Sequence, residues 1–146
     1  MTLRSLLGLL GLVLVSCFAG SPQNPQRSAA DNASSGLLGT AWRLEDLAGA
    51  RAVDGVEATL EFPKDGTAQG DTSCNRFFGG VKISGKSISF SSFATTRRGC
   101  PGAVDMQERS YLNALENAEW FALDGRALFI YSKGMDKPLR FIRTKP

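Results

Sequence analysis

The sequence predicts a mainly β protein: a small antiparallel β-barrel or roll of about seven to eight strands, with one α-helix inserted before the last three strands. Three observations predict it. Most of the chain from residue 37 onward alternates apolar and polar residues with a period of two. Short turn signals containing Gly or Pro separate these segments, as in hairpins. Only one segment is typical of a helix, and a sheet of this size hides its edges by closing on itself.

The first 36 residues are expected to be an export signal and a tether. An apolar and glycine run follows Arg4 and is too short to span a bilayer, which predicts a signal peptide over residues 1–16. The end of this run, Leu14-Val15-Ser16-Cys17, resembles the lipobox of bacterial lipoproteins, so Cys17 is the predicted site of lipid attachment. An ordinary cleaved signal and a buried structural cysteine are the alternatives. Residues 17–36 are rich in Ser, Pro, Gln and Asn, which predicts a flexible tether.

Lipidation at Cys17 predicts a protein that stays on a membrane without crossing it. The segment after Cys17 has no nearby aspartate and so resembles lipoproteins sent to the outer membrane of Gram-negative bacteria. We therefore expect the protein in the cell envelope, lipid-anchored to the outer membrane and facing the periplasm. In that oxidising compartment Cys74 and Cys100 form an even pair, and a bond between them would stabilise the domain by roughly 3.5 kcal/mol.

The first half of the domain, which is expected to span residues 37–146, reads as a series of hairpins. The predicted strands are residues 40–47, 56–62, 67–71, 80–84 and 87–91. Residues 80–87 also satisfy the Walker A pattern for phosphate binding. Their interior alternates like a strand and no helix follows, so we expect a hairpin at Gly85-Lys86 and no nucleotide binding.

Residues 101–119 form the helical candidate, with Pro101 near its start and strong helix formers along its length. An apolar stripe runs through Val104, Tyr111, Leu115 and Ala118, and Glu108 falls on the same stripe. A charge there is costly unless it is paired, so one hypothesis pairs Glu108 with Arg97 or Arg98. The alternative is a carboxylate that reaches solvent at the edge of the stripe.

The last three strands are predicted at residues 119–123, 126–132 and 139–144. The Asp124-Gly125 turn between the first two is a strong hairpin signal. Because this hairpin is apolar on both faces, we expect it to be central in the sheet.

Composition excludes several classes of function. The chain has 17 Lys and Arg, 14 Asp and Glu, and a formal net charge of +3, which argues against a nucleic-acid partner. It has no histidine, which excludes Ser-His-Asp and Cys-His catalysis and the commonest zinc ligand sets. We expect no catalytic residue, no metal site and no cofactor.

The box Cys74-Asn75-Arg76-Phe77 with Gly79, followed by Thr95-Thr96-Arg97-Arg98-Gly99-Cys100 and then Glu108, resembles the META domain of the HslJ family. The likeness covers the whole of the expected folded part. It implies a small bacterial envelope protein, often a lipoprotein, with a β-barrel-like fold and a helix; some members are linked to heat shock and to novobiocin resistance. The family motif residues are Asn75, Arg76, Phe77, Gly79, Thr96, Arg97 and Glu108. One departure is Arg98, where family members often have Met.

We interpret this motif as mainly architectural. Asn75 and Arg76 would donate hydrogen bonds that hold the loop, Phe77 and Phe78 would fill the core, and the glycines that follow would permit turns. This interpretation is favoured over a binding site because loops next to a disulfide usually order the scaffold.

The function expected is that of a non-enzymatic, envelope-anchored and stress-related binding module for an envelope protein or a cell-wall component. Two alternatives remain. One is a carrier of a small apolar or lipid ligand inside the barrel, in analogy to a lipid-binding pilotin of type III secretion systems. The other is an inhibitor of lysozyme or of a protease.

Overall fold

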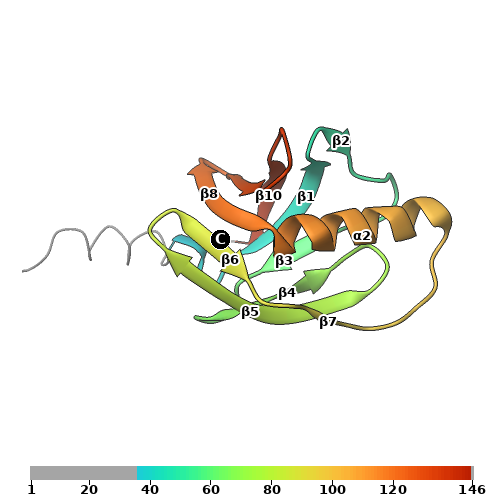
Figure 1. The fold of residues 1–146 in the computed structure, drawn as a ribbon, viewed down its shortest axis with the longest axis horizontal. Helices are drawn as coiled ribbons and strands as arrows, with labels where there is room; N and C mark the ends of the chain where they lie inside the picture. Colours follow the sequence, from blue (N-terminus) through green and yellow to red (C-terminus); the bar gives the residue numbers. More distant parts are fainter. Residues whose placement is uncertain (1–35, 146) are drawn as a thin grey trace, which may run out of the picture.

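The computed structural model describes residues 36–145, which include ten strands and one long helix (Figure 1). Gly36 and Leu37 also have a helical conformation. The strands are β1 (Ala41–Leu47), β2 (Ala50–Arg51), β3 (Thr59–Glu61), β4 (Thr67–Asp71), β5 (Arg76–Ser84), β6 (Ser87–Phe90), β7 (Ala94–Thr95), β8 (Ala118–Asp124), β9 (Ala127–Ser132) and β10 (Leu139–Lys145). The helix is α2 (Gly102–Glu116). The predicted signal peptide, Cys17 and all but the last residue of the predicted tether lie outside the described residues.

Eight of these strands close into an antiparallel barrel. Their order is β10-β9-β8-β6-β5-β4-β3-β1, and β1 pairs with β10 to complete the ring. The closing seam runs nearly the whole length of both strands, from Trp42 opposite Arg143 to Leu47 opposite Leu139. Short β2 and β7 pair with β1 and β5 outside the ring. The predicted barrel, with one helix before its last three strands, is confirmed; closure leaves no long edge of unpaired backbone groups.

Most predicted strands agree with the structure to within a few residues, and the differences occur where the chain leaves the barrel. The strand expected at residues 56–62 is shortened to β3, and its first part borders a surface groove instead. Strand β5 starts four residues earlier than predicted and includes part of the cysteine box. The helix ends at Glu116 because Ala118 already pairs with Ser132 as the first residue of β8.

The side chains that point inward fill the barrel. Trp42, Phe77, Tyr111 and Phe141 are buried, and the Tyr111 ring lies 5.9 Å from that of Phe77 and 6.1 Å from that of Phe141. Aliphatic residues from every long strand complete the core. Full burial of each such side chain contributes about 1.5 to 3 kcal/mol, so the interior is the main source of stability. The β8–β9 hairpin lies between β6 and β10, but every strand of a closed ring has two neighbours, so no strand is central as the sequence predicted. Trp120 and Leu123 of β8 are exposed on its outer side.

The two ends of the barrel are closed differently. At one end, which we call the helix end, α2 lies across the strands (Figure 1). From this helix the buried Tyr111 donates its hydroxyl to the Thr59 carbonyl at 3.0 Å. The opposite end carries the turns at residues 63–66, 85–86 and 125–126, and we call it the hairpin end. There the buried Leu37 closes the barrel, and the Arg143 guanidinium lies 4.7 Å above the Trp42 ring.

Candidate functional site

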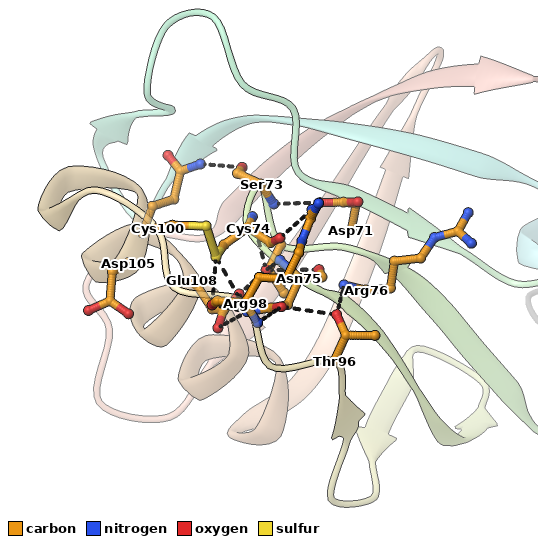
Figure 2. The surroundings of a disulfide bond; sticks show 12 residues. Asp71, Ser73, Cys74, Asn75, Arg76, Thr96, Arg98, Cys100, Asp105 and Glu108 are labelled. Atoms are coloured by element: carbon orange, nitrogen blue, oxygen red, sulfur yellow. Dashed lines mark hydrogen bonds between the residues drawn. A yellow bond between two sulfur atoms is a disulfide. The ribbon is translucent and has the colours of Figure 1, made fainter.

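A disulfide joins Cys74 to Cys100 at the helix end, as predicted (Figure 2). The two residues are 26 positions apart, and their Cα atoms are separated by 5.9 Å. The bond ties the loop before β5 to the loop before α2. It therefore fixes the start of the helix relative to the barrel wall.

Asn75 is the centre of a hydrogen-bond network beside this disulfide (Figure 2). Its side chain is buried, with a residue exposure of 3%. Its Nδ2 donates to the Arg98 carbonyl at 3.2 Å and to the Glu108 carboxylate at 3.1 Å. Its Oδ1 accepts from the Arg98 amide at 2.7 Å and from the Thr96 hydroxyl at 3.0 Å. Both ends of the Asn75 side chain therefore have hydrogen-bond partners. The buried Thr72 hydroxyl also contacts Glu108 and accepts from the backbone N–H of Asn75 at 2.9 Å.

Glu108 does not pair with Arg97 or Arg98, and that hypothesis is wrong. Among the described residues, no salt bridge includes Glu108. The Arg98 guanidinium instead donates to the Cys74 carbonyl at 2.8 Å, while the Arg97 side chain is exposed. The carboxylate remains partly exposed, as the alternative at the edge of the stripe expects, and it also binds the side-chain amide of Asn75. Neutral donors stabilise this charge, so no direct cation is needed.

The remaining polar motif residues hold β7 against β5. The Thr96 hydroxyl accepts from the Arg76 backbone amide at 3.0 Å, and the Thr96 amide donates to the Arg76 carbonyl at 3.0 Å. The Arg76 side chain is exposed and borders a recess of about 290 Å³ on the outer face of β3, β4 and β5. Arg76 therefore contributes to the scaffold through its backbone and not, as expected, through its side chain.

The aromatic and glycine part of the box follows the alternation of β5. Phe77 points into the core, whereas Phe78 points outward with an exposure of 64%, so only the first of the two predicted core residues is in the core. Gly79 lies within the strand and not in a turn. A Cβ atom there would lie 2.8 Å from Cδ1 of Phe93, whose ring packs 5.0 Å from that of Phe77. Gly79 is needed because the Phe93 ring crosses the strand at this point.

Gln107 is a site residue that sequence reasoning missed. It is buried on α2, where its Oε1 accepts from the Val53 amide at 2.7 Å and its Nε2 donates to the Ser73 hydroxyl at 2.7 Å. The side chain thus connects the helix, the cysteine loop and the segment that follows β2. In the sequence, the only sign that Gln107 is buried is its position next to Glu108, beside the apolar stripe of the helix.

Burial raises the pKa of the Tyr111 hydroxyl well above its usual value, and the negative charge of Asp71 raises it further. The phenol therefore stays neutral and keeps its hydrogen bond to the Thr59 carbonyl at 3.0 Å. Its role is to close the barrel, because the ring is fully buried and reaches no recess.

A groove of about 920 Å³ lies on the outer surface near the helix end. Phe129, Glu45 and Arg140 line it from the outward face of β9, β1 and β10, and Glu45 forms an ion pair with Arg140. Residues 49–57 border it and include Val53, whose amide Gln107 binds. The groove contains equal numbers of acidic and basic side chains, so it has no strong net charge. It is the recess that the sequence did not predict.

The Asn75 network is saturated by internal hydrogen bonds, and the two cysteines in it are bonded to each other. Between residues 36 and 145 no group of three or more Cys, Asp or Glu residues is placed to hold a metal ion. In the same part of the chain no helix is long and apolar enough to cross a membrane. The segment with the Walker A pattern is the β5–β6 hairpin, as predicted.

Comparisons with known proteins agree with this architecture. The NMR structure of a protein from Burkholderia xenovorans is 25% identical, with a TM-score of 0.64 over 94% of this chain and 100% of that chain. A second NMR structure, 20% identical, has a TM-score of 0.62 over 75% of this chain and 92% of its own and shares the fold. Among curated proteins no relative matches the sequence. The family model of the META domain matches residues 35–146, and the chain therefore belongs to the META domain family.

Proposed function

We propose that this protein is a non-enzymatic binding module, tethered to a membrane of the bacterial envelope, that binds a protein segment or a cell-wall polymer in its outer groove. The observation that carries the proposal is that, among the described residues, the Asn75 network and the barrel interior leave no free space for a ligand, whereas the outer groove does. The polar motif side chains Asn75 and Glu108 bond to each other and core side chains fill the barrel, whereas the groove of about 920 Å³ is open.

The groove has the volume of a binding site, and both apolar and polar side chains line it. Its volume falls within the range of typical ligand pockets, about 300 to 1,000 Å³. Phe129 offers an apolar surface, and the ion pair of Glu45 with Arg140 offers both a donor and an acceptor. A partner with apolar and polar groups along an extended chain suits such a lining better than a purely apolar ligand.

The disulfide and its network support this function by holding the groove in shape. Gln107 binds the Val53 amide on the groove border and the Ser73 hydroxyl in the cysteine loop. Because Cys100 fixes the start of α2, the helix presents Gln107 at a constant position. A preformed border lowers the cost of ordering on binding.

The membrane tether and the envelope location are part of the proposal and are supported by the sequence before residue 36. The role under stress is supported by the resemblance to HslJ-like proteins. A carrier function inside the barrel has less support, because the interior is occupied by large side chains such as Trp42, Tyr111 and Phe141.

Site-specific photo-crosslinking of the full chain in its native envelope tests the groove. Phe129 is replaced by the crosslinker benzoylphenylalanine, and Phe78 on the outer face of β5 is replaced in a matched control. We expect adducts of discrete mass from position 129 and none, or different ones, from position 78. Identical adducts from both positions, or no adduct from position 129, would exclude the groove as the binding site.

The intact mass of the membrane-extracted protein tests the tether. We expect the mass of the chain from Cys17 with two or three acyl chains, and with two hydrogens fewer than the reduced form because of the disulfide. A full-length, unacylated mass would remove the proposed anchor.

A further inference from the structure

We propose that the hairpin end of the barrel docks on the surface of a bilayer that contains anionic lipid, so that the helix end and the groove face away from the membrane. This inference rests on the proposed membrane tether. It adds the orientation of the tethered domain and names the residues that set it.

The chain enters the barrel at the hairpin end. Gly36, the first described residue, accepts a hydrogen bond from the Arg143 guanidinium at 3.2 Å, and Leu37 is buried as a plug. The 35 residues before Gly36 are therefore connected to this end of the molecule. The predicted tether, residues 17–36, would have a root-mean-square reach of about 25 Å as a flexible chain, so a lipid on Cys17 would keep the hairpin end close to the bilayer.

Basic side chains gather at the same end. Each of its three turns carries an exposed cation, namely Lys64, Lys86 and Arg126. None of the three takes part in a salt bridge between described residues. Together with Lys82 and Arg143 they make five cations, against four carboxylates nearby: Glu61, Asp65, Glu119 and Asp124.

The rest of the barrel is balanced in charge. Elsewhere between residues 36 and 144 there are nine cations and nine carboxylates. The net positive charge of this part of the chain is thus concentrated at the hairpin end, where an anionic surface would attract it. The attraction acts within a Debye length, about 8 Å at physiological salt, so it favours the orientation that places this end on the membrane.

Two exposed leucines border these cations. Leu38 is 48% exposed and Leu123 is 39% exposed, and a Cβ atom on Gly36 would lie 3.3 Å from Cδ1 of Leu123. Exposed leucines beside cations are the combination that binds the boundary between lipid headgroups and acyl chains. The contact is small, but the tether keeps its effective concentration high, so a weak contact is enough to orient the domain.

The test uses the chain from Cys17 onward, coupled through the Cys17 thiol to a maleimide lipid in nanodiscs that contain anionic lipid. Residues 36–145 close their own core and retain every described contact, and the remaining cysteines stay in their disulfide. A gadolinium-labelled lipid broadens amide NMR signals near the surface. We expect signals of Leu38, Lys86 and Arg126 to lose intensity at least about twofold more than those of Arg97 and Met106 at the helix end. Equal loss at both ends would overturn the proposal.

Matched charge reversals separate this surface from a general effect of net charge. The first variant combines Lys64→Glu, Lys86→Glu and Arg126→Glu at the hairpin end. The control combines Arg97→Glu, Arg109→Glu and Lys133→Glu, three exposed cations at the helix end, with the same change in net charge. We expect the first variant, or a purely zwitterionic nanodisc, to reduce the difference between the ends at least about twofold, to the level that the tether alone produces, and the control to keep the full difference.

A difference that neither the first variant nor the zwitterionic nanodisc reduces would also overturn the proposal. Because the lipid is attached chemically, the result does not depend on natural acylation. An unacylated native mass would remove the proposed anchor and leave this measurement of the surface standing.

Discussion

Exchanging the donor and the acceptor between Asn75 and Glu108 is a direct test of the network at the helix end. Asn75→Asp replaces the Nδ2 donor by a carboxylate oxygen 3.1 Å from a second carboxylate. It also places an acceptor against the Arg98 carbonyl, 3.2 Å away. Loss of hydrogen bonds to a charged group costs about 1.5 to 3 kcal/mol, and repulsion adds to it, so we expect at least about 3 kcal/mol of destabilisation at pH 7.

The second change, Glu108→Gln, supplies the missing donor. Alone it should cost about 1 to 2 kcal/mol, because the introduced glutamine side chain retains one acceptor for the Asn75 amide. Together with Asn75→Asp it restores an amide–carboxylate pair in the reverse direction. We therefore expect the double variant to be more stable than the sum of the single effects by at least about 1 kcal/mol.

Urea unfolding of the oxidised protein at pH 7, followed by circular dichroism, measures all four free energies of unfolding. Additive effects within about 0.3 kcal/mol, or a neutral Asn75→Asp, would refute the assignment of Asn75 as the hub.

Three further predictions concern other parts of the barrel. Gly79→Ala should cost about 1 to 3 kcal/mol, because its Cβ would meet the Phe93 ring at 2.8 Å, whereas Gly99→Ala, with open space around it, should cost far less; urea midpoints that do not differ would contradict this. Cys100→Ser should lower the free energy of unfolding by roughly 3.5 kcal/mol, and reduction of the native protein should reproduce the loss in the same assay. Because burial raises the pKa of Tyr111, its contribution to stability is complete below about pH 10 and is lost as pH rises further; unfolding from pH 8 to 11 should show this loss, and Tyr111→Phe should remove it. Parallel pH dependence of the two proteins would show that Tyr111 is not its source.

Sequence patterns predicted the elements of the barrel better than the roles of single residues. Alternation within β5 is local, and it correctly buries Phe77; the same rule applied strictly would have placed Phe78 outside. The glycine at position 79 was interpreted as a turn residue. Its actual reason, the ring of Phe93 from a later segment, depends on how β5 meets the loop before β7.

The charged and polar motif residues show the same difference between what the sequence predicts and what contacts between distant segments decide. A charge on an apolar stripe correctly indicated that Glu108 needs a partner, but any nearby donor could satisfy it. The choice of Asn75 over Arg98 follows from the turn before β5, which aims the amide at the helix and leaves the guanidinium to bind the Cys74 carbonyl. Such a choice between neighbours in space cannot be read from spacing along the chain.

By itself, the sequence determined the number and order of the main strands, the position of the helix, the closure of the sheet and the pairing of Cys74 with Cys100. These follow from local periodicity, turn residues and the count of cysteines. Only the tertiary structure decided that Asn75 is the hub of the network, that a groove lies outside a filled barrel, and that net positive charge collects at the hairpin end. Each of these depends on which loops meet at an end of the barrel, and contacts between segments distant in sequence have no local period to reveal them.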